Sequence, residues 1–98
     1  DLLPERALNG DDDARAQLVG EIYRPLAAAG SGLLETLTAY LDTSASIERT
    51  ARQLFVHANT VRYRLKRIAD VTGLTPTDAR DAYTMRVAIT LGLLNTST

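Results

Sequence analysis

The sequence predicts an all-α protein, a small helical bundle, and three observations lead to this fold class. Apolar residues recur at intervals of three and four along most of the chain, which is the spacing of one helix face. No segment alternates apolar and polar residues in the manner of a half-buried strand. Glycine and proline fall mostly between the periodic segments, where they can end one helix or begin the next.

A first helix is expected over residues 11–23. Its apolar residues lie at i, i+4 and i+8: Ala14, Leu18 and Ile22. Three aspartates, Asp11–Asp13, fall in its first turn, where the helix dipole favours negative charge. We interpret them as a charged helix start and not as metal ligands, because no further ligand pattern accompanies them.

Pro25 is expected to end or kink that helix, because proline lacks the N–H that an interior helical position donates. The next stretch, Leu26–Gly32, is rich in alanine and glycine and is expected to be a connection. We therefore place a boundary there, with residues 1–30 on one side and residues 31–98 on the other.

The next helix is expected from Gly32 to about Asp42, with Ser31 as its N-cap. A wide apolar stripe covers this segment: Leu33, Leu34, Leu37, Tyr40 and Leu41. We expect the stripe, Tyr40 included, to lie in the core.

Two helices in close succession follow, separated by a three-residue turn at 55–57. Ser46 is the predicted N-cap of the first helix, whose apolar residues recur at i, i+4 and i+7: Ile47, Ala51 and Leu54. The second helix, over about 58–70, repeats that spacing: Val61, Leu65 and Ile68. We expect Gly73 to end it as the C′ residue, and Val56 to plug the core from the turn.

The last helix is expected to begin with Thr75 as its N-cap, Pro76 at the first helical position and Asp78 at N3. One of its faces is expected to be apolar and buried: Tyr83, Val87, Leu91 and Leu94.

Composition limits the functional classes. The chain has 98 residues, 45% of them apolar, no cysteine and a single histidine, His57. Disulfide scaffolds, thiolate zinc sites, cysteine nucleophiles and histidine-rich metal sites are therefore not expected. No apolar run approaches the roughly 18 residues that span a bilayer, and no secretory signal opens the chain, so we expect a cytoplasmic protein without membrane association. Because the chain begins at Asp1 and not at Met, we expect a fragment or processed product of a longer protein.

Charge is unevenly distributed. Residues 1–46 carry a net charge of −5 and residues 47–98 a net charge of +4, and within residues 47–68 six basic residues accompany a single acid, Glu48. Such a concentration of positive charge is expected of an anion-binding face. On charge alone, a solvated basic helix explains the pattern equally well.

A short helix, a three-residue turn and a longer basic helix form the layout of a helix-turn-helix, whose second helix enters the DNA major groove. If the apolar residues of the second helix point to the core, a polar face points outward: Asn59, Thr60, Tyr63, Lys66 and Arg67, flanked by Arg62 and Arg64. Such a face can hydrogen-bond base edges and phosphates. The sequence therefore predicts DNA binding by residues 47–69.

Position along the second helix separates the expected roles. Its N-terminal residues reach base edges in such motifs, so the candidates for base readout are His57, Ala58, Asn59 and Arg62, with Tyr63 able to contact bases or backbone. Thr60 is better placed for a phosphate, which backbone N–H groups at the helix N-terminus can also bind. Phosphate contacts are expected from four basic residues: Arg49, Arg52, Lys66 and Arg67.

Two of these residues have a structural alternative. His57 can simply cap the second helix, and Arg64 lies close enough to the core side to form a salt bridge within the bundle instead of contacting DNA.

The run from Thr50 to Ile68, TARQLFVHANTVRYRLKRI, resembles the C-terminal helix-turn-helix of PucR/CdaR-type bacterial transcriptional regulators. The similarity extends from Leu34–Asp42 to Thr72–Leu74 and the last helix. Leu3–Leu8 and Tyr23–Leu26 resemble the end of the upstream domain in that family.

The resemblance implies a multidomain regulator whose N-terminal part senses a small molecule and whose C-terminal part binds double-stranded DNA, with a homodimer or higher oligomer formed by the full-length protein. Residues 1–30 would then be the C-terminal end of the upstream domain plus a connection, and residues 31–98 the helix-turn-helix DNA-binding domain. Where the family usually carries a basic residue, commonly arginine, this chain has Ala58, which can make only an apolar contact, for instance with a thymine methyl group.

A function of a different class is also open. A helical protein-interaction or dimerisation module could use the same basic face to bind an acidic partner. An enzyme is not expected, because the sequence contains no nucleophile–base pair and no phosphate-binding glycine loop, and it implies no cofactor and no metal.

Overall fold

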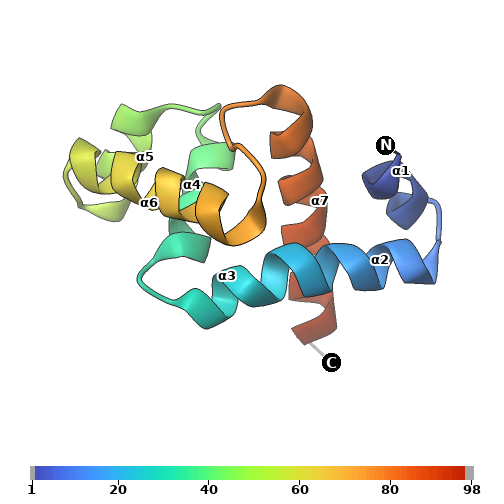
Figure 1. Ribbon diagram of the computed structural model, residues 1–98. Helices are drawn as coiled ribbons and strands as arrows, with labels where there is room; N and C mark the ends of the chain where they lie inside the picture. Colours follow the sequence, from blue (N-terminus) through green and yellow to red (C-terminus); the bar gives the residue numbers. More distant parts are fainter. Residues whose placement is uncertain (1, 97–98) are drawn as a thin grey trace.

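The computed structural model describes residues 2–96, which contain helices and turns and no strand. The elements in chain order are α1 (Leu3–Leu8), α2 (Asp12–Leu18), the π-helical turn η1 (Val19–Tyr23), α3 (Arg24–Ala29), α4 (Leu33–Asp42), α5 (Ile47–Leu54), α6 (Ala58–Thr72) and α7 (Ala79–Thr96) (Figure 1). The prediction of an all-α bundle is confirmed. None of the described helices is long and apolar enough to cross a membrane.

Elements α2, η1 and α3 form one continuous helical rod (Figure 1), so of the two outcomes expected at Pro25, an end or a kink, the helix does not end there. The Arg24 N–H donates to the Val19 carbonyl, five residues back, as in a π turn. This wider turn lies directly before Pro25 and accommodates a proline that an uninterrupted α-helix would reject. The connection shrinks from the expected Leu26–Gly32 to the three residues at 30–32.

Helix α1 was not expected as a separate element. Pro4 lies in its first turn, where the N–H that proline lacks would have no helical partner. The helix packs against α2 and α7. Its Glu5 carboxylate accepts two hydrogen bonds from the Arg80 guanidinium on α7, at 2.5 and 2.7 Å.

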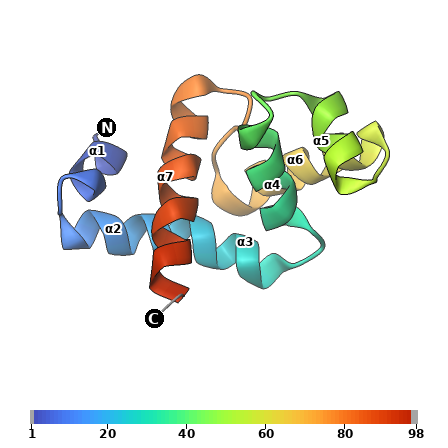
Figure 2. The same ribbon diagram turned by 180° about the vertical axis from the view of Figure 1, so that it is seen from behind.

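Helix α7 runs between α1 on one side and α4 on the other, and it crosses the α2–α3 rod at η1 (Figures 1 and 2). One hydrophobic core joins residues from every part of the chain, among them Leu18, Leu26, Leu37, Ile68 and Met85. Residues before and after position 30 therefore share a single core. The division into an upstream remnant and a DNA-binding domain stays a prediction.

Because α7 is covered on two sides, its buried residues do not form the single stripe that was expected. Val87 and Leu91 are buried as predicted, and Met85, Ala88 and Ile89 are buried beside them. Tyr83 and Leu94 are exposed, so their assignment to the core was wrong. The Tyr83 ring instead lies 5.6 Å from the Arg80 guanidinium, in cation–π range.

Two of the predicted helix ends are confirmed and two were wrong. Ser46 caps α5, and Gly73 follows α6 with a φ of 73°. Ser31 does not cap α4, because Gly32 occupies that position and no side chain makes the capping hydrogen bond. Thr75 does not cap α7, which begins only at Ala79, and the Asp78 carboxylate accepts the Asp81 N–H at 2.9 Å instead.

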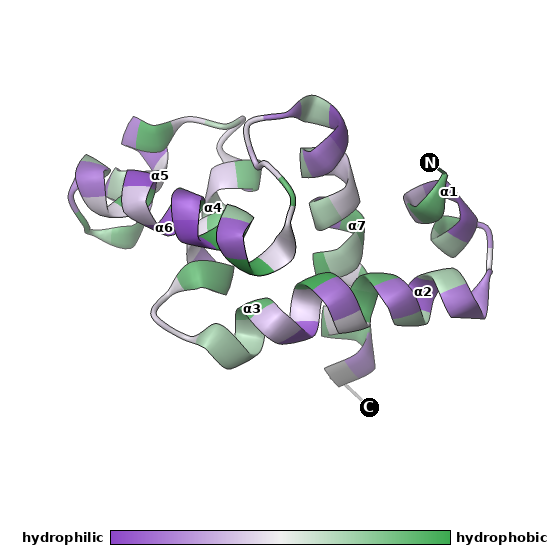
Figure 3. Ribbon diagram, viewed as in Figure 1, coloured by the Kyte–Doolittle hydropathy of each residue, from purple (hydrophilic) through white to green (hydrophobic). Residues whose placement is uncertain are grey.

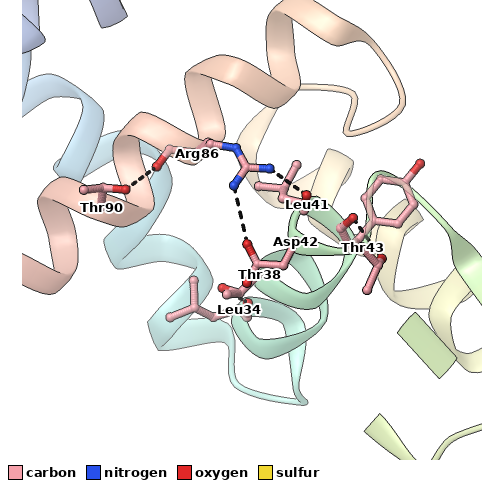
Figure 4. Close-up of polar contacts among 8 residues, drawn as sticks. Leu34, Thr38, Leu41, Asp42, Thr43, Arg86 and Thr90 are labelled. Carbon is pink, nitrogen blue, oxygen red and sulfur yellow. Dashed lines mark hydrogen bonds and ion pairs between the residues drawn. The ribbon is translucent and has the colours of Figure 1, made fainter. Parts of the chain in front are cut away.

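Arg86 ties α7 to the C-terminal end of α4 (Figure 4). Its guanidinium donates to the Leu41 carbonyl at 2.6 Å and to the Asp42 carboxylate at 3.4 Å. A cation at this end of α4 satisfies a carbonyl without a helical partner and complements the helix dipole. The contact positions α4, on which both α5 and α6 pack.

Candidate nucleic-acid interface

The start of α5 is held on the end of α4 by hydroxyl groups. Ser46 Oγ accepts the Arg49 N–H at 3.1 Å, which satisfies one free donor of the first turn. The fully buried Thr50 donates its hydroxyl to the Ser46 carbonyl at 2.6 Å, and its Oγ1 lies 3.1 Å from Thr43 Oγ1. These contacts determine the direction in which α5 leaves α4.

The turn between α5 and α6 is a Schellman motif with phenylalanine in the left-handed position. The Val56 N–H donates to the Ala51 carbonyl at 3.0 Å, and the Phe55 N–H donates to the Arg52 carbonyl at 3.3 Å. Val56 packs against the core as expected. Phe55 has φ 58° and ψ 43°, and its side chain is 94% exposed.

Helix α6 has the orientation that its apolar spacing predicts. Val61, Leu65 and Ile68 are buried, and they hold the helix against α4 and α5. The N-cap is His57, whose Nδ1 accepts the Asn59 N–H at 3.0 Å, so the capping role considered for this histidine is present. A ring nitrogen that accepts a hydrogen bond carries no proton, and Nε2 is then the nitrogen that can donate outward.

Most of the expected contact residues are exposed along α5 and α6, where hydrophilic positions gather (Figure 3). The exposed members are Arg49, Arg52, His57, Asn59, Arg62, Tyr63, Lys66 and Arg67. Ala58 and Thr60 are half-buried, and Ala58 packs against the core. These two side chains therefore offer less surface to a partner than the exposed ones do.

Arg64 is directed into the bundle and away from the exposed face of α6. Its Nη1 donates to Thr36 Oγ1 on α4 at 3.2 Å. A Cβ atom at Gly32 would lie 2.8 Å from the same Nη1, so the absent side chain makes room for the guanidinium. The internal role considered for Arg64 is therefore present, as a hydrogen bond to a hydroxyl and not as a salt bridge.

The basic side chains of α5 and α6 form no ion pair within residues 2–96. The ion pairs among these residues join Arg6 to Asp11, Arg80 to Glu5 and Arg86 to Asp42, all outside residues 47–68. The exposed cations on α5 and α6 are thus available to an external anion.

One pair of exposed side chains at the start of α6 is already ordered. Arg62 Nη1 donates to Asn59 Oδ1 at 2.8 Å, across one turn of the helix. The contact occupies the Asn59 oxygen and leaves the amide NH₂ and the remaining guanidinium N–H groups free to point outward. Amide and guanidinium donors of this kind can bond purine edges or phosphate oxygens.

Sequence reasoning did not identify Phe55 as a candidate functional residue. The signal was present, because a large apolar residue stands at the position after α5 where a Schellman motif usually has glycine. Its exposure could not be foreseen, since a phenylalanine beside Val56 could equally have packed inward.

The chain is similar to a known protein family and to several known proteins. A family model described as the PucR C-terminal helix-turn-helix domain matches residues 33–91. The chain is 62% identical over 95 residues to an uncharacterized protein of Mycobacterium tuberculosis, covering 97% of this chain and 23% of that protein. It is 37% identical over 90 residues to the carbohydrate diacid regulator of Escherichia coli, covering 87% and 22%. It is 40% identical over 57 residues to the purine catabolism regulatory protein of Bacillus subtilis, covering 58% and 11%.

A solved structure is similar over nearly the whole chain. The crystal structure of a regulator of polyketide synthase expression from Bifidobacterium adolescentis superposes with a TM-score of 0.90 at 46% sequence identity, covering 96% of this chain and 40% of that one. The chain spans 23% or less of the length of the curated relatives named above.

Proposed function

The chain belongs to the family of PucR C-terminal helix-turn-helix domains, and from this premise we propose that it binds double-stranded DNA sequence-specifically, with α6 in the major groove. Its biological role would be that of the C-terminal domain of a bacterial transcriptional regulator. Such a domain acts by binding and not by catalysis, and it works in the cytoplasm, where bacterial DNA lies.

The observation that carries this proposal is the combination of unpaired cations with a polar, rigidly held face of α6. The buried Val61, Leu65 and Ile68 determine which side of α6 points outward. That side presents Asn59, Arg62 and other donors beside exposed arginines that have no ion-pair partner within residues 2–96. Side chains that can hydrogen-bond base edges thus lie next to basic side chains that can bind phosphates.

Roles follow from position on the two helices. We assign base contacts to the N-terminal part of α6, at His57, Ala58, Asn59 and Arg62, with Tyr63 at their edge. Thr60 and four basic residues contact phosphates: Arg49, Arg52, Lys66 and Arg67. His57 combines two roles, because it caps α6 through Nδ1 and keeps Nε2 for the partner.

The full-length protein would bind as a homodimer. Two recognition helices would then address half-sites about one helical turn of DNA apart, roughly 34 Å. Residues 1–30 would join this domain to an upstream domain that senses a small molecule.

A binding experiment with one informative and one matched control variant tests the proposal. The chain is titrated into a labelled duplex that it has selected from a randomised pool, and into a scrambled duplex, across a series of salt concentrations. Arg62→Ala removes a predicted base contact, and Arg6→Ala removes the same charge from α1, where Arg6 pairs with Asp11. The expected result is a steep loss of affinity with salt, weaker and less selective binding by Arg62→Ala, and wild-type binding by Arg6→Ala.

Two outcomes would contradict the proposal. Salt-sensitive binding that Arg62→Ala and Arg6→Ala weaken equally, with no preference for the selected duplex, would indicate a generic basic surface. No binding at low salt by either the chain or a tethered tandem of two copies would favour a protein-interaction module with an acidic partner.

A further inference from the structure

Phe55 combines two properties that folding alone does not account for. Its backbone is left-handed, a conformation that L-residues with a side chain rarely adopt, and its ring is 94% exposed. The chain uses glycine for the corresponding task at the end of α6, where Gly73 has a φ of 73°. Three small non-glycine residues, Ser31, Ser44 and Ala45, also have positive φ, and Phe55 is the one large residue among residues 2–96 that does so.

The local structure does not require the phenyl ring. Both hydrogen bonds of the turn, from Phe55 and Val56 to the α5 carbonyls, are made by the backbone, and glycine would make them without steric cost. The core contact of the turn belongs to Val56. A strained residue whose side chain is not packed points to a role outside the fold.

The place of the ring indicates what that role is. Phe55 lies in the turn, three residues after the exposed Arg52 and two residues before the cap His57. It thus borders the face for which we propose DNA binding. The exposed arginines of α5 and of the start of α6, Arg49, Arg52 and Arg62, favour a polyanion over an apolar protein surface, because burying them against apolar groups would be costly.

We propose that the Phe55 ring contacts an apolar surface of DNA, either a thymine methyl group or the edge of a deoxyribose, beside the N-terminus of α6. This inference rests on the proposed DNA binding. Methyl groups and sugar edges are the apolar surfaces that DNA presents to such a ring. The contact adds affinity without counterion release, because phenylalanine carries no charge.

Phe55→Gly tests the contact, because glycine suits the left-handed position and leaves the turn intact. We expect its thermal midpoint to equal or exceed that of the wild-type chain, while its affinity for the selected duplex falls about tenfold, the loss expected for one buried aromatic contact. The slope of affinity against salt should not change. Leu8→Ala removes another exposed apolar side chain, on α1, and should leave both affinity and slope at wild-type values.

A second duplex separates the two sources of apolar surface. In it, deoxyuridine replaces every thymidine, so that only the methyl groups are lost. A methyl contact predicts that the wild-type chain loses more affinity on this replacement than Phe55→Gly does. A sugar contact predicts that Phe55→Gly weakens binding to both duplexes equally.

The outcomes distinguish this inference from the function on which it rests. If the wild-type chain binds the selected duplex and Phe55→Gly binds it equally well, the Phe55 contact is wrong and the DNA-binding function stands; the ring would then belong to a protein interface. If the wild-type chain binds no duplex, both are wrong. A loss of affinity accompanied by a lower thermal midpoint would also count against the contact, because it would make Phe55 a folding residue.

Discussion

The Tyr23 ring packs directly against the backbone of α7 at Gly92. A Cβ atom at position 92 would lie 2.1 Å from Tyr23 Cγ, closer than any real contact allows. Glycine within a helix is unfavourable by about 1 kcal/mol relative to alanine, so this close approach accounts for its presence. The contact joins η1 to α7 and thereby the N-terminal rod to the rest of the bundle.

Gly92→Ala should therefore destabilise the protein despite the higher helix propensity of alanine. We expect a loss of about 1–3 kcal/mol in the free energy of unfolding, because Tyr23 must shift within a packed core. Gly20→Ala is the matched control, since no atom lies within 4 Å of a Cβ at that position, and it should be neutral or slightly stabilising. Chemical denaturation of both variants measures the difference. Equal stabilities would mean that η1 does not pack on α7 as described.

His57 can be tested for its two roles with a pair of substitutions. His57→Ala removes the acceptor for the Asn59 N–H and should cost about 1 kcal/mol of stability, whereas His57→Asn supplies a new cap and should cost less. Both remove Nε2, so both should weaken binding to the selected duplex if the ring contacts DNA. Wild-type affinity in His57→Asn would show that His57 only caps α6. Thermal unfolding and duplex titration on the same samples give both readouts.

Arg67 is expected to differ from Arg62 in its effect on binding. Because it lies further along α6, Arg67→Gln should weaken binding to selected and scrambled duplexes by the same factor. It should also lower the slope of log affinity against log salt by about one unit, the effect of one lost phosphate contact. Arg62→Ala should instead reduce the preference between the two duplexes. A loss of selectivity in Arg67→Gln would move base readout further along the helix.

The attachment of α1 to α7 should depend on pH. Hydrogen bonds from Arg80 lower the pKa of Glu5 from 4.5 to about 2. A carboxyl group whose pKa is lowered by folding stabilises the folded state fully above its unfolded pKa, and the contribution disappears as pH falls through the folded pKa. The contribution of this pair should thus decline from about pH 4.5 and be lost near pH 2.

An NMR titration of the Glu5 carboxyl carbon measures this directly. In the wild-type chain the pKa of Glu5 should be about 2, and in Arg80→Met it should return toward 4.5. A wild-type pKa near the ordinary value would mean that the Glu5–Arg80 pair does not persist in solution.

Periodicity predicted the orientation of α6 well because this helix packs against its neighbours with one face. Val61, Leu65 and Ile68 were assigned to the core from their spacing, and the structure buries all three. Because those residues determine which face of α6 points to the core, the outward position of Asn59, Arg62 and Tyr63 was predictable as well. Which of these side chains touch DNA stays a prediction.

The spacing of apolar residues did not predict which residues are buried where a helix has neighbours on more than one side. Helix α7 is covered from two sides, so Met85 and Ile89 are buried and Tyr83 is exposed, against the single predicted stripe. At Pro25 the helix was expected to end or kink, and a π turn directly before the proline allows it to continue. The direction of Arg64 was left open because it depends on Thr36 and Gly32, which lie about thirty residues away in the chain.

By itself, the sequence determined the helical class, the helix-turn-helix layout, the cap at Ser46 and the side of α6 that carries its polar groups. These features depend on contacts within one helix or between successive helices, whose geometry is the same wherever they occur. Only the tertiary structure decided that η1 passes over Gly92, that Arg80 binds Glu5 and that Phe55 points into solvent. Each of these three contacts or exposures depends on how complete helices pack around a shared core. The spacing of residues along the chain does not specify that packing.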